Sequence, residues 1–162
     1  GFGREAVQAL KGAGILVDVS HLNDQGFEDF LSVARKPFAA SHSNARAVCG
    51  HRRNLTDEQV REMAARGCLI GLNYCNIFLR PDGQPATLDD LWRHVEHLVE
   101  LGAEHCLALG SDADGADLPP CLDGPEKFAG LYSFLLERGL SVPQAEGILW
   151  KNALNFFRRQ LI

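Results

Sequence analysis

The sequence contains no run of about 20 apolar residues, the length that a bilayer-spanning helix needs, and neither end has the pattern of a signal peptide or a lipid anchor. An excess of basic residues is also missing, because 16 Lys and Arg stand against 21 Asp and Glu, for a formal charge of -5. Such an acidic chain would not attract a polyanion. We therefore expect no nucleic acid and no membrane as partners, and favour a small molecule or a peptide.

The sequence also lacks a CxxC pair, although it has five cysteines. An odd number of cysteines cannot be fully paired, and several of these lie in apolar segments, where free thiols act as small hydrophobic side chains. We therefore predict free thiols and a cytoplasmic location. No linker divides the 162 residues, and an apolar fraction of 46% suffices for one folded unit.

Four short apolar segments alternate with amphipathic ones along the chain. The predicted strands are 15–21, 38–42, 68–73 and 106–112. The predicted helices are 2–10, 24–35, 56–67, 88–101, 125–138 and 142–158, and capping boxes at Thr56 and Ser141 mark the start of two of them. Helices between successive strands are typical of a parallel sheet, because parallel neighbours need a crossover connection.

Two α/β architectures fit this order. An open, doubly wound sheet would suit the length, whereas a barrel of eight strands needs about 250 residues and would be only half present. Polar residues end all four strands, however: His21, His42, Asn73 and Asp112. Since the carboxyl ends of barrel strands meet at one mouth, these side chains would converge there. We therefore predict that residues 1–162 are a single partial domain, the C-terminal half of a (β/α)8 barrel, with four parallel βα units and a C-terminal helix. Because the first helical pattern begins at once, we also expect an N-terminal half to precede it.

The two histidines at consecutive strand ends are the first candidates for a site. A lone histidine in such a place is more often a hydrogen-bonding core residue than a ligand. Two together indicate a metal more strongly, because imidazole suits zinc, and a catalytic zinc keeps one position open for water. On this evidence alone, His21 and His42 leave both interpretations open.

Four motifs occur in order along the sequence: DVSH at 18–21, SHSNAR at 41–46, RRNLTD at 52–57 and GSDADG at 110–115. Together they resemble the renal (membrane) dipeptidase family, which are zinc peptidases built on a β/α barrel. The resemblance covers nearly the whole chain and includes the spacing of 21 residues between the two histidines.

The resemblance implies a role for each of four residues. His21 and His42 match the ligands of one zinc ion in a two-zinc centre, Arg53 matches the residue that binds the terminal carboxylate of the substrate, and Asp112 matches the acid that handles protons at the attacking water. A metal-bridged water would then hydrolyse a dipeptide. The residue types suit these roles. Apart from the resemblance, Arg53 would be a solvated loop cation and Asp112 a turn former.

The family's remaining ligands, a His-x-Asp pair and a bridging Glu, belong to its N-terminal half, which this sequence does not contain. Two imidazoles fall short of the three protein ligands usual at a catalytic zinc. We therefore expect weak or partial zinc binding and no activity from this chain by itself. A half barrel would also expose two sheet edges and an apolar interior. The expected partners are a dipeptide substrate and, to close the barrel, the N-terminal half or a second copy in a homo-oligomer.

Two alternative functions stay open: a barrel metallohydrolase acting on a lactone, a β-lactam or another amide, and a non-catalytic binding module of barrel type. Two further motifs carry less weight. The segment 94–97 is not H-E-x-x-H, and we expect it on the solvated flank of a helix. The segment 112–117 departs from a calcium loop, so we predict no calcium there.

Overall fold

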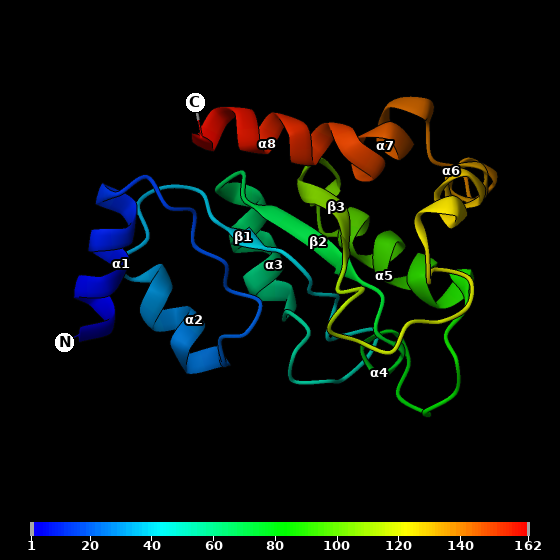
Figure 1. The fold of residues 1–162 in the computed structure, drawn as a ribbon, viewed down its shortest axis with the longest axis horizontal. Coiled ribbons are helices and arrows are strands. Elements are labelled where there is room, and N and C mark those ends of the chain that lie inside the picture. The colour runs from blue at the N-terminus through cyan, green and yellow to red at the C-terminus, as the bar shows by residue number, and fades with distance from the viewer. Residues whose placement is uncertain (1, 162) are drawn as a thin grey trace.

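A parallel sheet of three strands forms the centre of the computed structural model, which describes residues 2–161. The strands lie in the order β1 (Ala39–Ala40), β2 (Leu69–Asn73) and β3 (Leu107–Ser111). In register, Ala39 pairs with Leu69, and Ile70 pairs with Leu107. A helix connects each strand to the next (Figure 1). The prediction of an α/β fold with a parallel sheet is confirmed.

The helices agree with the predicted segments to within a few residues, except that α2 is shorter, the segment 142–158 is divided by a π-helical turn, and α4 was not predicted. They are α1 (Phe2–Gly12), α2 (Asp24–Leu31), α3 (Asp57–Ala65), α4 (Asn76–Leu79), α5 (Leu88–Glu100), α6 (Phe128–Glu137), α7 (Val142–Glu146) and α8 (Asn152–Leu161), with 3-10 turns η1 (Glu104–Cys106) and η2 (Pro125–Lys127) and the π-helical turn η3 (Gly147–Lys151). Both predicted capping boxes are present, at Thr56 and at Ser141.

The first predicted strand, 15–21, is reduced to an extended segment with one parallel bridge, Asp18 to Ala39. The ladder ends because a side chain takes the place of the backbone carbonyl that would accept the next N–H of β1. The carboxylate of Asp18 accepts hydrogen bonds from the backbone N–H groups of Ser20 and Ser41, each at 3.0 Å. The ladder therefore stops one residue after it begins, and β1 is correspondingly short.

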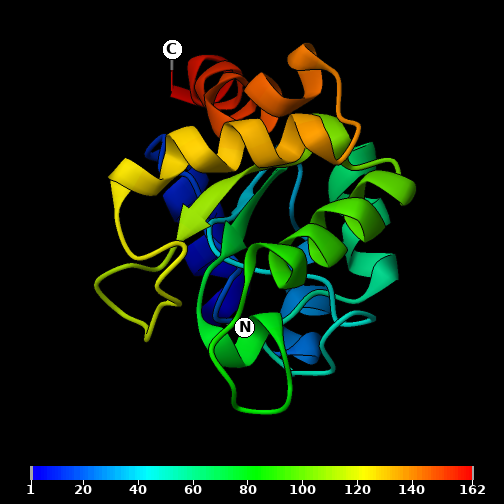
Figure 2. The ribbon, with the colours of Figure 1, turned by 90° about the vertical axis from the view of Figure 1, so that its right-hand side faces the viewer.

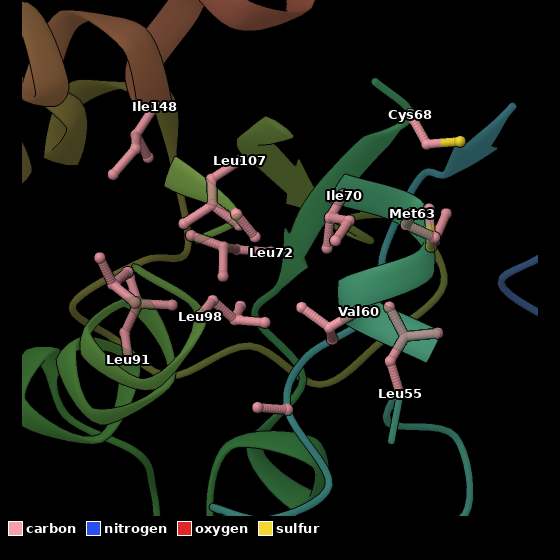
Figure 3. Close-up of a cluster of buried hydrophobic side chains, with 14 of the residues drawn as sticks. Leu55, Val60, Met63, Cys68, Ile70, Leu72, Leu91, Leu98, Leu107 and Ile148 are labelled. Atoms are coloured by element: carbon pink, nitrogen blue, oxygen red, sulfur yellow. The ribbon is translucent and has the colours of Figure 1, made fainter. Parts of the chain in front are cut away.

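The core lies between the sheet and the helices α3 and α5, which Figure 2 shows on one side of the strands. Ile70 and Leu72 of β2 point into it and are fully buried. Val60 of α3 and Leu98 of α5 meet them there, and both are fully buried as well (Figure 3). Each side chain of this kind contributes about 1.5–3 kcal/mol when buried, so this layer fixes how the strands lie.

A second, smaller cluster packs under α8, near the starts of the strands. Phe156 of α8 is buried against Ala39, Leu69 and Ala108, which come from the three strands. Figure 1 shows α8 along this edge of the sheet, with α4 beyond the opposite edge, where the strands end. Helix α8 therefore packs at the end of the sheet where the strands begin, and α4 lies at the end where they finish.

The five cysteines are free, as predicted, and four of them are buried. Desolvation raises the pKa of Cys68 and of Cys106 to about 11, so both stay protonated at neutral pH. Among residues 2–161, the helices are too short or too polar to cross a bilayer.

Candidate active site

His21 and His42 meet beyond the carboxyl ends of their strands. Their Nε2 atoms lie 2.9 Å apart, and the ring centroids are 4.9 Å apart at an interplanar angle of 60°. Two residues separated by 21 positions in the sequence therefore point their ring nitrogens at the same place. Partial burial lowers the pKa of His42, which favours the neutral imidazole that a metal requires.

A group of polar side chains holds His42 in place through hydrogen bonds. The Ser41 hydroxyl contacts the carboxylate of Asp18 closely and lies 2.7 Å from Nδ1 of His42. The Ser20 hydroxyl accepts the backbone N–H of His42 at 3.1 Å. Desolvation raises the pKa of Asp18, but the hydrogen bonds from Ser41 and Ser20 lower it by more, so the carboxylate is ionised at neutral pH.

Two glycines make room for this turn. A Cβ atom added at Gly71 would lie 1.9 Å from the carbonyl oxygen of Ser41, and one added at Gly110 would lie 2.1 Å from the same oxygen. Any side chain at either position would push the Ser41 carbonyl away. The place of His42 thus depends on two residues, in β2 and β3, that have no side chain.

Arg53 reaches the histidines from the loop after β1. Its Nη2 atom lies 3.4 Å from Nε2 of His21, and its guanidinium carbon lies 5.7 Å from the ring centroid of Phe78. Its Nη1 atom is buried and has no hydrogen-bond partner within residues 2–161. Desolvation lowers the pKa of Arg53, against the opposing influence of Asp112 and Asp18. A buried donor without a partner is costly, so this guanidinium is suited to an anionic ligand.

Asp112 follows β3 on a strained turn. Its φ angle is 68° and that of Ser111 is 39°, both in the left-handed region that residues with a side chain seldom adopt. The amide of Asn73 donates to Oδ2 of Asp112 at 3.1 Å and holds the carboxylate at the end of the sheet. Such strain is common at functional sites, where the surrounding structure enforces it.

His21, Arg53 and Asp112 line one hollow of about 400 Å³, together with α4 and the loop after β3. Ile77 and Phe78 of α4 form its apolar wall. Sequence reasoning missed this wall, although Ile77-Phe78-Leu79, an apolar triplet before Arg80-Pro81, was a signal for a short helix. The structure thus brings all four predicted site residues to one place, while their roles remain predictions.

The residues present fit a zinc ion in part. At a tetrahedral zinc with Zn–N distances of about 2.0–2.1 Å, two ligating nitrogens stand roughly 3.3 Å apart. The separation of 2.9 Å between the two Nε2 atoms is close to this value. No group of three His, Cys, Asp or Glu side chains able to hold a metal occurs within residues 2–161. The described chain therefore offers two imidazole ligands and not a complete set.

The expectation for residues 94–97 needs a correction. His94 is fully buried instead of lying on a solvated flank. Its Nδ1 accepts the backbone N–H of Ala45, and its Nε2 donates to the carbonyl of Leu79, each at 3.1 Å. The helical periodicity does place His94 beside Leu91, Val95 and Leu98 on the inner stripe of α5, and two backbone partners make an imidazole acceptable there.

The matches found among known proteins agree with one another. Residues 1–161 match the sequence family described as membrane dipeptidase, peptidase family M19. A protein of Klebsiella pneumoniae, described as an uncharacterized protein in the pqqA 5' region, is 37% identical over 155 residues, which is 94% of this chain and 56% of that protein. An uncharacterized dipeptidase of Schizosaccharomyces pombe, C3A11.10c, is 30% identical over 96% of this chain and 39% of its own length.

A solved structure is similar along almost the whole chain. It is a metallo peptidase from Rhodobacter sphaeroides, liganded with a phosphinate mimic of the dipeptide L-Ala-D-Ala. The TM-score is 0.92 at 32% sequence identity, and the match covers 98% of this chain and 46% of that one. The chain therefore spans about half the length of the proteins that it matches.

Proposed function

The chain belongs to the membrane dipeptidase family, peptidase family M19, and from this premise we propose that it supplies one part of the active site of a zinc-dependent dipeptidase. One observation carries the proposal. The paired Nε2 atoms of His21 and His42, 2.9 Å apart, stand beside the guanidinium of Arg53. Its Nη2 atom lies 3.4 Å from Nε2 of His21, and its buried Nη1 atom has no hydrogen-bond partner among residues 2–161. Two metal ligands and an anion-binding group in one place match what hydrolysis of a free dipeptide requires.

In this proposal, His21 and His42 hold one zinc ion. When bound, zinc polarises the scissile carbonyl and supplies an activated water. A catalytic zinc usually has three protein ligands, and the described residues offer two imidazoles. The remaining ligands, including those of a second ion, would come from outside these residues. The chain by itself is then expected to bind zinc weakly and to be inactive.

Arg53 and Asp112 act on the substrate. Nη1 of Arg53 pairs with the terminal carboxylate of the dipeptide, which gives the buried donor its missing acceptor. Asp112, held by Asn73, accepts a proton from the attacking water and returns it to the leaving amine. The relative that holds a mimic of L-Ala-D-Ala makes dipeptides with a C-terminal D-residue the first substrates to examine.

The architecture that we propose for the complete protein is a (β/α)8 barrel in which this chain is the C-terminal half, as one partial domain. The order of three parallel strands with an extended segment beside β1 supports it. So does the length of the relatives, about twice that of this chain. The other half, or a second copy, would cover the segment 15–20 and the exposed face of α1, which has no buried residue.

The direct test is hydrolysis by the full-length protein. We expect it to cleave L,L and L,D dipeptides in preference to lactones and β-lactams, and to contain bound zinc. His42→Ala removes one of the two imidazole ligands. The variant should therefore contain less zinc than the wild type, and its kcat/KM should fall by at least about 100-fold. The control is His105→Ala, which replaces an exposed histidine in η1, before β3 and away from the site.

Two results would contradict the proposal. Less than one bound metal ion per full-length protein would argue for a non-catalytic module. Preferential hydrolysis of a lactone or β-lactam over every dipeptide would assign the site to a different barrel hydrolase.

A further inference from the structure

The hydrogen bonds below His42 determine where its ring proton lies. Oδ1 of Asp18 already accepts two backbone N–H groups, and Oδ2 contacts the Ser41 hydroxyl. An ionised carboxylate has no proton and can only accept. The Ser41 hydroxyl must therefore donate its single proton to Asp18.

The next contact follows from the first. The Ser41 oxygen lies 2.7 Å from Nδ1 of His42, which is a hydrogen-bond distance. Since the hydroxyl proton points at Asp18, the oxygen has only lone pairs to offer to the ring, and Nδ1 must be the donor. A neutral imidazole has one N–H. Its Nε2 is then unprotonated, and this is the atom that faces His21.

His21 differs from His42 in this respect. No hydrogen bond to Nδ1 of His21 is found within residues 2–161, and its side chain is exposed. Because Nε2 of His42 is unprotonated, the 2.9 Å contact makes Nε2 of His21 the donor in the metal-free protein. His21 must therefore move its proton to Nδ1 before Nε2 can bind a metal, whereas His42 need not. Ligating histidines usually donate their second ring N–H to a carboxylate, a carbonyl or water. In this chain a serine stands between the carboxylate and the ring.

We infer that Asp18, acting through the Ser41 hydroxyl, holds His42 in its Nδ1–H tautomer and so prepares Nε2 to bind a metal before any metal arrives. The inference rests on the proposed function for the identity of that metal. Asp18 and Ser41 are positioning residues, because they act through His42 and touch neither metal nor substrate. Zinc would then meet one ligand whose lone pair already points into the site.

The test uses the full-length protein and measures two quantities in each variant: the tautomer of His42 in the metal-free state and the affinity for zinc. Long-range ¹H–¹⁵N correlation spectra report which ring nitrogen of His42 carries the proton, and titration calorimetry with zinc alone measures affinity. We expect Nδ1–H in the wild type. Ser41→Ala should release the tautomer towards Nε2–H and weaken zinc binding by about 10- to 100-fold. Ser41→Thr keeps the hydroxyl and should restore both readouts.

Asp18→Asn supplies a second, independent variant. The amide can donate to the Ser41 oxygen, which turns the hydroxyl proton towards Nδ1 and favours the wrong tautomer. Because Asp18 also holds two backbone N–H groups, this variant is accompanied by circular dichroism and thermal unfolding; Ser41→Ala leaves those two bonds in place. Ser43→Ala is the matched control, since its buried hydroxyl has no partner in the described structure. It should change neither readout.

The outcomes separate the inference from the proposed function. An Nε2–H tautomer in the wild type, or a folded Ser41→Ala protein with unchanged tautomer and zinc affinity, would overturn the inference. A full-length wild-type protein that binds no zinc would overturn the proposed function. In that case the tautomer measurement alone decides whether Asp18 and Ser41 fix the ring, and an unchanged spectrum in Ser41→Ala would reject it.

Discussion

The guanidinium of Arg53 lies beside the ring of His21 and over the face of Phe78, and its buried Nη1 atom has no hydrogen-bond partner among residues 2–161. A substrate carboxylate would supply the acceptor that Nη1 lacks. Hydrogen bonds to charged groups are worth about 1.5–3 kcal/mol. We therefore expect Arg53→Ala in the full-length protein to lower kcat/KM for a dipeptide by roughly 10- to 100-fold.

To test whether Arg53 binds the terminal carboxylate, hydrolysis of a free dipeptide is compared with hydrolysis of the same dipeptide as its C-terminal amide, which has no carboxylate. The wild type should prefer the free dipeptide, and Arg53→Ala should lose the preference. The control is Arg52→Ala, which changes an exposed neighbour. A variant that keeps full preference for the carboxylate would show that Arg53 does not bind it.

His94 gives a prediction about stability and pH. Burial lowers its pKa to about 4, well below the 6.5 of an unfolded histidine. Between these values the unfolded chain binds more protons than the folded chain, so the free energy of unfolding falls as the pH drops from about 6.5 towards 4. The loss amounts to roughly 3 kcal/mol for this residue.

His94→Gln has no such proton to bind, and we expect its stability to change less over the same pH range. At neutral pH it should be less stable than the wild type by about 1–3 kcal/mol, because Ala45 and Leu79 lose well-placed partners. Urea unfolding at several pH values measures both effects, with the exposed His105→Gln as control. An identical pH slope in His94→Gln and wild type would contradict the assignment.

At the scale of residues, sequence reasoning found the four side chains whose motifs lie at strand ends or in the loop after them. The structure places His21, Arg53 and Asp112 in one hollow, with His42 against His21. Sequence could not supply what depends on long-range geometry. Phe78 belongs to the site only because α4 folds back beside it. The pattern placed His94 on a helix, but only the structure shows its two backbone partners.

At the scale of elements, the glycine pair Gly71 and Gly110 makes a sharp prediction. Gly71→Ala would place a methyl group against the Ser41 carbonyl. Overpacking of this kind costs about 1–3 kcal/mol, and the displaced turn carries His42. We expect a lower unfolding temperature together with weaker zinc binding, measured by calorimetry.

The control lies in α6, where a Cβ atom at Gly130 would meet nothing within 4 Å. Alanine is favoured over glycine inside a helix by roughly 0.5–1 kcal/mol. Gly130→Ala should therefore raise stability slightly and leave zinc affinity unchanged. If Gly71→Ala behaved in the same way, the close approach of Ser41 would not matter for the site.

Local sequence signals predicted most helices well, since capping boxes such as that at Thr56 act within one turn. The strand at 15–21 was overestimated for a reason that local pattern does not contain. Its apolar residues are typical of a buried strand, but the carboxylate of Asp18 takes the N–H of Ser41, 23 positions away, and ends the ladder. The half barrel itself remains a prediction.

At the scale of the whole molecule, the uncovered surface near the N-terminal segment predicts association. Phe2 is 86% exposed and Ile15 is 52% exposed, and a hollow of about 550 Å³ opens between α1 and α2. Open edges and apolar patches of this kind favour pairing. We expect sedimentation velocity to show concentration-dependent association of the 162-residue chain.

A lysine in the uncovered segment 15–20 should weaken that association, because its charge would be costly to bury in an interface. Ile15→Lys is the variant, and Val142→Lys, at the similarly exposed start of α7, is the control. A monodisperse 17.8 kDa species at every concentration would contradict the prediction.

The position of α8 has a practical consequence for engineering. Phe156 packs where the strands begin, and the histidines lie where they end. In parallel α/β sheets, ligands bind beyond the carboxyl ends of the strands, so changes at the opposite end affect stability more than chemistry. Directed evolution for greater stability should therefore concentrate its libraries around Ala39, Leu69, Ala108 and Phe156, which pack at the opposite end of the strands from the four candidate site residues.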